Sequence, residues 1–319
     1  MTSLAHLGEK EVVRRLINEI SSTAAVGPGD DAAAIDMGDY YLVISTDLLS
    51  EKTHKPKEMT YRQFGWSVAA VNFSDIAAMG AKPIGILLSF GVPKRLRYEN
   101  LREMMRGAME CCNLVGATIL GGDTKETSEI TVVGTAIGIV GKDEILLRKG
   151  AKLGDLVAVT GTLGLAAAGY FALKNGLRCA KCLKALFEPL PRVEEGLTLS
   201  SSGFVTSCID ISDGLAFSLK HLSEASGVSF QVEWEKIPVD SHVYKIAKAS
   251  KINEEELVLY FGGDYQLLFT INPDGWRILE KRLNSKISVI GKVIDADENI
   301  LIRNNTKVKL EDRGYEHFR

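Results

Sequence analysis

The sequence has no excess of basic charge and no continuous apolar segment at its start. Its 38 Lys and Arg against 41 Asp and Glu give a formal net charge of −3, so no basic field attracts nucleic acid or an anionic membrane. Residues 1–20 carry charges through an amphipathic pattern, which differs from the apolar core of a signal peptide. The uncharged run 156–173 is broken by TGTLG, which indicates a strand, a turn and a helix. We predict a cytoplasmic protein that binds neither nucleic acid nor membrane.

Cysteine is scarce, and its spacing does not indicate a disulfide framework. Cys111 and Cys112 are adjacent on a predicted helix and Cys208 lies in an apolar run, which suits a reducing compartment. Cys179 and Cys182 form one C-x-x-C with no second Cys or His pair nearby, so the ligand count does not support a zinc site.

The common nucleotide-binding and hydrolase motifs are also missing. The chain contains no G-x-x-x-x-G-K-[ST], no Rossmann G-x-G-x-x-G and no kinase H-R-D, and neither G-x-S-x-G nor H-E-x-x-H occurs. A triad hydrolase or a zinc protease therefore finds no support. Phosphoryl transfer would need another kind of site, such as carboxylates that gather metal ions.

Length and composition predict two globular domains. The chain has 319 residues, of which 45% are hydrophobic and 25% charged. Strands and helices alternate irregularly, which favours an α+β fold of two mixed α/β-layer domains over a strict doubly wound sheet. Because RKGAKLGD at 148–155 resembles a connector, we expect one domain at 1–149 and another at 150–319.

The expected elements follow from periodicity and turn residues. In the first domain these are helices near 8–20, 60–79 and 96–115, and strands at 40–49, 83–93, 117–123 and 129–141. In the second they are strands at 156–161, 229–237 and 265–271, helices at 165–175, 215–226 and 274–283, and a closing pair of short strands.

The helix at 60–79 raises the first functional question. Phe64, Val68, Val71 and Met79 recur at steps of three and four, which predicts an amphipathic helix with one apolar face. Asp75 falls on that face, where an unpaired carboxylate costs several kcal/mol, roughly. A mid-helix position is neither a turn nor a cap, so Asp75 needs a positive partner.

Further aspartates lie in apolar or glycine-rich stretches that contain almost no cations. They are Asp30, Asp31, Asp47, Asp123, Asp210, Asp213 and Asp264, and only Asp123 has a Lys within two positions. Taken singly, such residues are explained by turns and N-caps. Taken together, they would repel one another unless a cation joined them, and Mg²⁺ shared with phosphates is the usual partner. His54 follows one of these stretches and is either an exposed loop histidine or a ligand.

Nine motifs in order resemble thiamine-monophosphate kinase, a family in the superfamily of aminoimidazole ribonucleotide synthetase and selenophosphate synthetase. They are GPGDDAAAI, VISTDLL…TH, AVNFSDIAAMGAKP, LGGDT, RKGAKLGDLVAVTGTLG, PRVEEG, IDISDGL, GGDYQLLF and GYEHF, and they span nearly the whole chain. The resemblance implies transfer of phosphate from ATP to thiamine monophosphate with several Mg²⁺ ions. It also implies a homodimer whose N-terminal domains pair through their sheets and help to form the ATP cleft.

The same resemblance assigns roles to individual residues. Metal ligands would be Asp30, Ser45, Thr46, Asp47, Asp75, Asp123, Asp210 and Asp213, with Asp210 and Asp213 acting in catalysis. The nucleotide would meet Gly122, Asp123, Arg148 and Ser212. The thiamine part would meet His54, Gly263 and Tyr315.

The chain departs from the family pattern at two places. Gly263 stands where many bacterial members have an acidic substrate contact, and Met105 stands near an aromatic nucleotide contact. The alternatives are another ATP-dependent synthetase or kinase of the superfamily, or a metal- and nucleotide-binding protein without enzymatic activity. Selenophosphate synthetase would want a reactive Cys near the N-terminus, and no Cys precedes Cys111.

Overall fold

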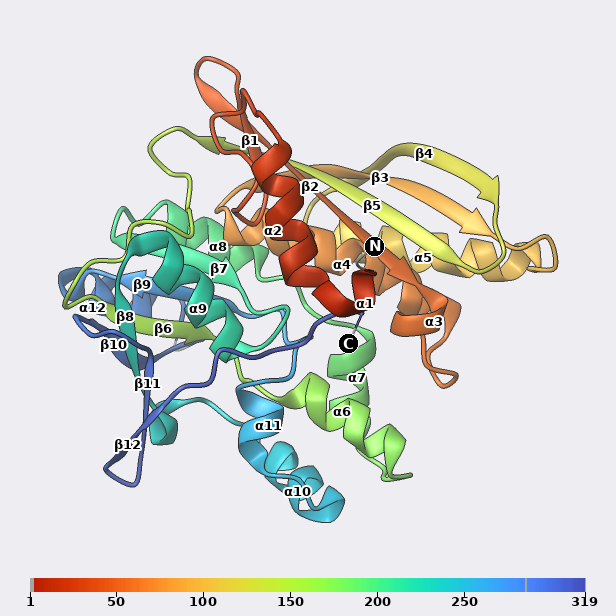
Figure 1. The fold of residues 1–319 in the computed structure, drawn as a ribbon. Coiled ribbons are helices and arrows are strands. Elements are labelled where there is room, and N and C mark those ends of the chain that lie inside the picture. Colours follow the sequence, from red (N-terminus) through yellow and green to blue (C-terminus); the bar gives the residue numbers. More distant parts are fainter. Residues whose placement is uncertain (1–2, 285, 319) are drawn as a thin grey trace.

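Two sheets organise the protein in the computed structural model, which describes residues 3–284 and 286–318 (Figure 1). The five-stranded sheet has the strand order β1-β2-β5-β3-β4, and the seven-stranded sheet has the order β12-β11-β8-β10-β6-β9-β7. The expected mixed α/β architecture with two sheets is confirmed. None of the described helices is long and apolar enough to cross a membrane.

The five-stranded sheet and its helices come from the first half of the chain. The strands are β1 (Ala33–Asp36), β2 (Tyr40–Ser50), β3 (Lys82–Val92), β4 (Thr118–Glu126) and β5 (Thr131–Gly141). The helices are α1 (Leu4–Leu7), α2 (Glu9–Glu19), α3 (Glu51–His54), α4 (Tyr61–Ala78) and α5 (Tyr98–Leu114). All strand pairs are antiparallel except β3 with β4, which follows the crossover helix α5.

The seven-stranded sheet comes from the second half. Its strands are β6 (Leu156–Thr160), β7 (Val205–Asp210), β8 (Ser229–Glu233), β9 (Leu267–Ile271), β10 (Ile287–Ile294), β11 (Ile300–Arg303) and β12 (Thr306–Lys309). Its helices are α6 (Leu165–Lys174), α7 (Ala180–Phe187), α8 (Val193–Ser200), α9 (Leu215–Ser226), η1 (Trp234–Lys236), α10 (Ser241–Ser250), α11 (Glu254–Val258) and α12 (Pro273–Arg282). The sequence pattern does not predict α7, α8, α10 or α11, because such short helices show too few periods.

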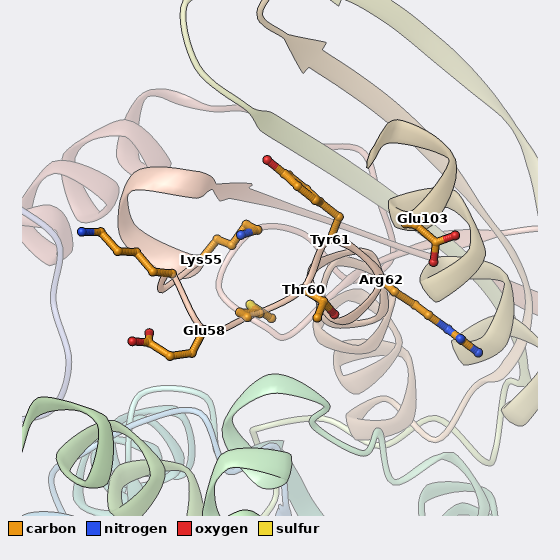
Figure 2. Close-up of a pocket in the computed structure, with 8 residues that line it drawn as sticks. Lys55, Glu58, Thr60, Tyr61, Arg62 and Glu103 are labelled. Atoms are coloured by element: carbon orange, nitrogen blue, oxygen red, sulfur yellow. The ribbon is translucent and has the colours of Figure 1, made fainter. Parts of the chain in front are cut away.

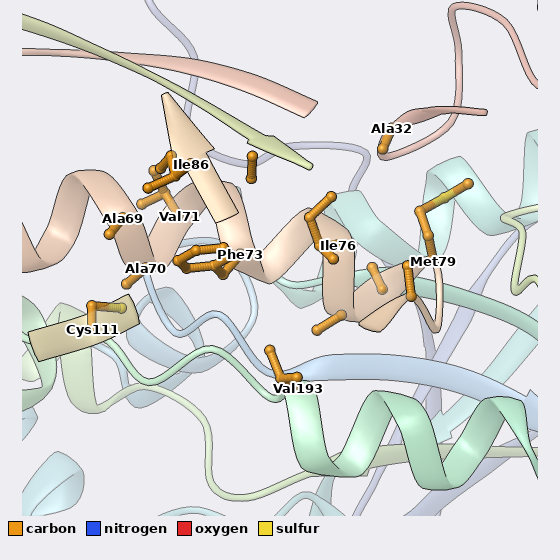
Figure 3. Close-up of a cluster of buried hydrophobic side chains, with 14 of the residues drawn as sticks. Ala32, Ala69, Ala70, Val71, Phe73, Ile76, Met79, Ile86, Cys111 and Val193 are labelled. Atoms are coloured by element: carbon orange, nitrogen blue, oxygen red, sulfur yellow. The ribbon is translucent and has the colours of Figure 1, made fainter. Parts of the chain in front are cut away.

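Helix α4 is buried on nearly every side, so the expectation of a single apolar face was wrong. Of its 18 residues, 13 are buried, among them Val71, Phe73 and Ile76 (Figure 3). The first sheet and α5 cover part of the helix, and the second half covers the rest. Ser67 donates a hydrogen bond to the Phe187 carbonyl at 2.8 Å, and a Cβ on Gly196 of α8 would lie 2.3 Å from the Ala77 oxygen. The two halves therefore share one core around α4.

The other face of the five-stranded sheet is open. Burial alternates strictly along β5, and no described helix lies over its less buried side (Figure 1). Several outward residues there are apolar: Leu48 pairs with Val133 across β2 and β5, and Leu87 lies beside Thr135. Leu48 is 55% exposed and Leu87 39% exposed. An apolar sheet face without cover is unusual in a monomer.

The two ends of the chain lie side by side (Figure 1). The Lys10 amide of α2 donates to a carboxylate oxygen of Glu316 at 3.3 Å, and the His317 amide donates to Glu9 at 2.9 Å. The first helices are thereby attached to the C-terminal segment.

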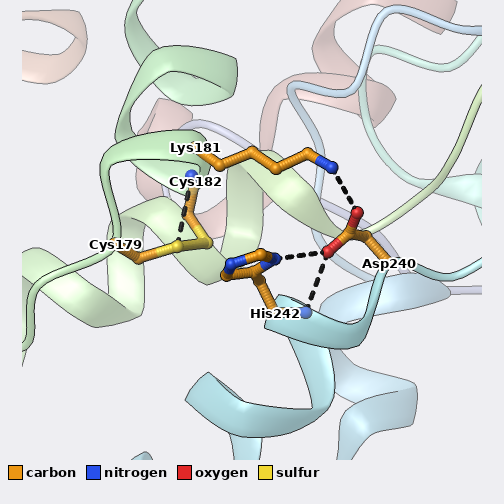
Figure 4. The surroundings of a disulfide bond; sticks show 5 residues. All are labelled: Cys179, Lys181, Cys182, Asp240 and His242. Carbon is orange, nitrogen blue, oxygen red and sulfur yellow. Dashed lines mark hydrogen bonds and ion pairs between the residues drawn. A yellow bond between two sulfur atoms is a disulfide. The ribbon is translucent and has the colours of Figure 1, made fainter.

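A disulfide joins Cys179 and Cys182 at the start of α7 (Figure 4). The expectation of reduced cysteines was wrong for this pair, because the first turn of the helix brings their Cα atoms to 5.3 Å. Cys179 is the N-cap, and its sulfur accepts a hydrogen bond from the Cys182 amide at 3.3 Å. Cys111, Cys112 and Cys208 are free and buried.

Candidate functional site

Three carboxylates from distant parts of the chain converge where α4 meets both sheets. Asp31 precedes β1, Asp75 lies in the last turn of α4, and Asp210 ends β7. Their nearest oxygens all lie within 4.8 Å of one another. Asp75 belongs to this cluster because the last turn of α4 lies where the two halves of the chain meet.

Hydroxyl groups of the same elements orient these carboxylates. Ser45 of β2 donates a hydrogen bond to Asp75, and Ser74 of α4 donates to Asp210 at 2.6 Å. The Asp47 amide donates to the Asn72 side-chain oxygen of α4 at 3.0 Å, which ties β2 to the helix. Ser45 and Asp47 therefore lie on the face of β2 that is turned toward α4.

The carboxylates carry more negative charge than the protein balances. Burial raises the pKa of Asp75 well above its usual range, and the charges of Asp47, Asp210 and Asp31 raise it further. Burial likewise raises the pKa of Asp210 to about 7 and that of Asp213 to about 6. These raised pKa values result from removing several like charges from water. A bound divalent cation would compensate the negative charge and lower the pKa values again.

Arg148 forms an ion pair with one member of this cluster, Asp31. Its guanidinium lies 2.6 Å from one oxygen of Asp31, while the other oxygen of Asp31 is buried without a hydrogen-bond partner among the described residues. Asp30 points elsewhere and accepts the Arg148 backbone amide at 3.2 Å. The structure thus brings Asp31 into the cluster rather than its neighbour Asp30. The sequence shows both aspartates but not which one turns inward.

Thr46 and Asp123 are not brought to the cluster by their side chains. Thr46 lies on the opposite face of β2 from Ser45 and donates to the Gly134 carbonyl at 2.9 Å. Asp123, next to Gly122 on β4, has a 59% exposed side chain that lies 3.6 Å from Lys125. Strands β5 and β3 separate β4 from β2 in the sheet.

The rings of His54 and Tyr315 both lie near the ring of His317. The ring of His317 lies 5.6 Å from that of His54 and 5.1 Å from that of Tyr315. The Tyr315 amide donates to the Asp213 carbonyl at 3.1 Å. Burial, followed by the charge of His317, lowers the pKa of His54. Sequence reasoning missed His317, although it lies within the tail motif GYEHF.

The segments that carry Ser212 and Gly263 are paired through their backbones. The Gly263 amide donates to the Ser212 carbonyl at 2.7 Å. Asp264 is turned away from the other aspartates and accepts the amides of Gly164 and Ala166 at the start of α6, at 2.7 and 3.3 Å. It therefore accepts amides at the N-terminus of a helix that lies about 100 residues earlier in the chain, where a carboxylate is favourable. Met105 packs against the core around α4.

A hollow of about 580 Å³ lies apart from these residues, at the N-terminal end of α4 (Figure 2). Lys55, Tyr61, Arg62 and Glu103 are among the residues that line it. None of the clustered aspartates lines it, so the carboxylate cluster and not this hollow is the candidate site of the chemistry.

Comparison with known proteins matches both halves. Residues 29–140 match the model for the N-terminal domain of AIR synthase related proteins, and residues 152–304 match that for the C-terminal domain. The thiamine-monophosphate kinase of Methanospirillum hungatei is 38% identical over 90% of this chain and 92% of its own length. The chain belongs to the thiamine-monophosphate kinases of the AIR synthase related family.

Other members of this family agree over the full length. The thiamine-monophosphate kinase of Pyrococcus horikoshii is 32% identical over 99% of this chain and 98% of its own. A solved structure described as AaThiL complexed with AMPPCP and TMP is 26% identical, has a TM-score of 0.89, and is matched over 99% of both chains. The resemblance inferred from the ordered motifs is confirmed.

Proposed function

We propose that this protein transfers a phosphoryl group from ATP to thiamine monophosphate, forming thiamine diphosphate and ADP. The observation that carries the proposal is the convergence of Asp31, Asp75 and Asp210, without sufficient positive charge, in a chain of this family. Relatives named thiamine-monophosphate kinase and a neighbour with an ATP analogue and TMP support both substrates.

The residues present fit magnesium. The donors are carboxylate and hydroxyl oxygens, which hard divalent cations prefer. One buried oxygen of Asp31 has no hydrogen-bond partner among the described residues, and a bound cation would coordinate it. To Asp31 we add the ligands expected from the motifs, which are Asp30, Ser45, Thr46, Asp47, Asp75, Asp123, Asp210 and Asp213. Bound Mg²⁺ would neutralise charge on the phosphates and hold donor and acceptor in line.

The protein's own residues bind and orient the two substrates on either side of the aspartates. We place the nucleotide on the side of Arg148, with Ser212, Gly122 and Asp123, and the thiamine part with His54, Gly263 and Tyr315. A phosphate acceptor is already largely ionised near neutral pH, with a second pKa of about 6. A strong general base is not required, which agrees with a site that is rich in carboxylates.

We also propose a homodimer formed through the open face of the five-stranded sheet. This would cover Leu48 and Leu87. It would also let the exposed Gly122 and Asp123 of β4 contribute to a site shared by two copies, since β5 and β3 separate β4 from β2 in their own sheet. In this arrangement residues 1–149 form the nucleotide and dimer domain, and residues 150–319 complete the metal and substrate site. A cytoplasmic location stays a prediction.

The test is product analysis with ATP, Mg²⁺ and a panel of acceptors. We expect thiamine diphosphate from thiamine monophosphate, and no product without Mg²⁺. If thiamine monophosphate is ignored while an aminoimidazole precursor or selenide is used, the activity assigned within the superfamily is wrong. Binding of nucleotide without any turnover would favour a protein without enzymatic activity.

A further inference from the structure

Ser74 carries a buried hydroxyl near the C-terminal end of α4, and its hydrogen bond leaves the helix. A polar side chain inside a helix commonly bonds the carbonyl four residues earlier, and Asn72 makes such a bond to Val68 at 2.8 Å. The Ser74 hydroxyl instead donates to one carboxylate oxygen of Asp210 at 2.6 Å, across 136 positions of the chain. Ser74 is 0% exposed, so water cannot replace this partner. The local needs of the helix therefore do not explain the bond.

Asp210 is held by both halves of the chain, but at different atoms. In the second half, its backbone pairs with Leu267 of β9, and its carbonyl accepts the Ser218 hydroxyl of α9 at 3.0 Å. These contacts fix the backbone of Asp210 and leave its side-chain torsions free. The contact with its carboxylate comes from Ser74 in the first half. The bond from Ser74 therefore restrains how the carboxylate is turned.

The direction of this carboxylate matters because of its neighbours. The nearest oxygens of Asp31, Asp75 and Asp210 lie within 4.8 Å of one another. Asp75 follows Ser74 directly, so α4 carries one carboxylate of the cluster beside the donor that orients another. A carboxylate that accepts one hydrogen bond keeps further lone pairs for a cation, and such outer partners set the direction of metal ligands. Because the hydroxyl of Ser74 is neutral, it orients Asp210 without compensating the charge that attracts a cation.

We propose that Ser74 is a positioning residue, whose hydroxyl turns the Asp210 carboxylate toward Asp31 and Asp75 so that these three can hold a divalent cation together. The inference rests on the proposed function, which supplies the cation as Mg²⁺ with nucleotide. Ser74 itself binds no metal and no substrate. Since α4 packs against β7 and the two groups come from different halves, the orientation of Asp210 depends on how the halves are docked.

The plainer explanation is that the bond only holds the halves together, and Ser67 allows the two explanations to be separated. Ser67 lies on the same helix seven residues earlier and is also buried. Its hydroxyl likewise donates to the second half, to the Phe187 carbonyl at 2.8 Å. The two serines share their residue type, their burial and their link between the halves. Only the bond of Ser74 ends on a carboxylate of the cluster.

The test compares Ser74→Ala with Ser67→Ala and Ser218→Ala. Each variant removes one buried hydrogen bond, so each should lose some melting temperature without ligands. Mg²⁺ binding is then measured by calorimetric titration in the presence of a nonhydrolysable ATP analogue. We expect the half-saturating free Mg²⁺ concentration to rise about 10-fold or more in Ser74→Ala, as for the loss of a partner that orients a metal ligand. In the other two variants it should stay within about twofold of wild type.

Steady-state kinetics provide a second readout. The Mg²⁺ dependence of turnover in Ser74→Ala should shift by about the same factor as its Mg²⁺ binding. KM for thiamine monophosphate at saturating Mg²⁺ should stay within about twofold in all three variants, because the change concerns the cation and not the acceptor.

Several outcomes would overturn the inference. Wild-type Mg²⁺ affinity in Ser74→Ala would leave its bond as a structural link only. An equal loss of affinity in Ser67→Ala would mean that any loosening between the halves suffices, and an equal loss in Ser218→Ala would assign the effect to the backbone of Asp210. A wild type that does not bind Mg²⁺ would remove the inference together with the metal site.

Failure of the proposed function is distinguishable from these outcomes, because Mg²⁺ binding is measured without turnover. A wild type that binds Mg²⁺ with the analogue but does not phosphorylate thiamine monophosphate would count against the proposed function alone. The comparison of Ser74→Ala with its two controls would still decide whether Ser74 positions Asp210.

Discussion

Asp75 shows at the scale of one residue how a functional group can be recognised from periodicity. Its position on the buried face of α4 is unfavourable for a carboxylate, and the structure places it among Asp31, Asp47 and Asp210. Without metal, the repulsion between these carboxylates lowers the stability of the folded protein. Changes at this cluster should therefore separate stability from activity.

The variant Asp75→Asn tests this separation. Asn keeps the shape and one oxygen but lacks the charge that a hard cation needs. We expect phosphoryl transfer to fall about 10²-fold or more, while the metal-free fold is kept or stabilised because one like charge is removed. Melting curves with and without Mg²⁺ and a nonhydrolysable nucleotide measure both effects.

Wild type should gain melting temperature with these ligands by linkage, and Asp75→Asn should gain much less. An aspartate with a purely structural role would behave in the opposite way. Its loss would lower the stability of the metal-free protein, and the ligand-dependent gain would stay the same.

Asp210 gives a prediction for pH dependence. Its folded pKa of about 7 lies above the unfolded value of about 3.9, so the folded protein binds more protons between these values. This group's favourable contribution is fully present below pH 4 and is lost as pH rises toward 7. Without metal, Asp210→Asn should gain stability relative to wild type over this range, by on the order of 1 kcal/mol or more. Urea unfolding at several pH values measures the difference.

Saturating Mg²⁺ and nucleotide should abolish this pH-dependent gain, because the cation stabilises the charged carboxylate. A difference between the two proteins that stays constant from pH 4 to 8 would contradict the raised pKa. Asp210→Glu is a suitable companion, since it keeps the charge but changes the reach of the carboxylate toward Ser74.

The sequence predicts Asp47, Asp75 and Asp210 at the site but leaves other members undecided. Asp30 and Asp31 are adjacent in a loop, and only the path of that loop turns Asp31 inward. Side-chain direction in irregular segments is set by tertiary contacts, which lie outside the reach of periodicity.

At the scale of elements, long periodic segments are predicted well and short ones poorly. β2, α5 and α9 lie close to their expected bounds. The burial of α4 was underestimated, because α8 and the segment at Phe187, more than 100 residues downstream, cover its second side. For a helix between two domains, the amphipathic pattern predicts the face that packs against one domain but not the face that packs against the other.

The disulfide at the start of α7 should contribute little to stability. It closes a loop of only four residues, so it restrains the unfolded chain by about 2 kcal/mol at most. The double variant Cys179→Ser/Cys182→Ser keeps a hydroxyl at the N-cap, which supports the helix start. We expect a loss of about 2 kcal/mol or less in denaturant unfolding, and unchanged kcat. Treatment of wild type with a dithiol reductant should give the same result.

A loss of stability above about 2 kcal/mol, or a change in kcat, would show that the Cys179–Cys182 disulfide does more than stabilise the first turn of α7. Because Phe187 at the end of α7 receives the hydrogen bond from Ser67 of α4, such a result would point to a link between α7 and the helix that carries Asp75.

At the scale of the whole molecule, the closest carboxylates belong to one chain, whereas Asp123 does not reach them. The cluster needs both halves, since Asp31 and Asp75 come from the first and Asp210 from the second. The apolar residues on the open face of β2, β3 and β5 are not covered in one copy, and the exposed Asp123 on β4 is paired only with its neighbours Thr124 and Lys125 among the described residues. The family resemblance implies a dimer that pairs through the sheets, but the sequence does not show which face of the sheet stays open.

The prediction at this scale is that Leu48→Arg disrupts a C₂ dimer. Leu48 lies on the open face beside Val133, and a two-fold interface there would bury a charge without a partner, which costs several kcal/mol, roughly. Light scattering at micromolar concentration should give twice the chain mass for wild type and the chain mass for the variant. The matched control is Leu114→Arg, a 54% exposed residue at the end of α5, which should remain dimeric.

If Asp123 reaches the nucleotide only across the dimer, Leu48→Arg should also lose activity at a concentration where it is monomeric, and recover part of that activity as the protein concentration rises. A wild type that is monomeric and fully active would refute the dimer, and the nucleotide role of Asp123 would then have to be explained within one chain.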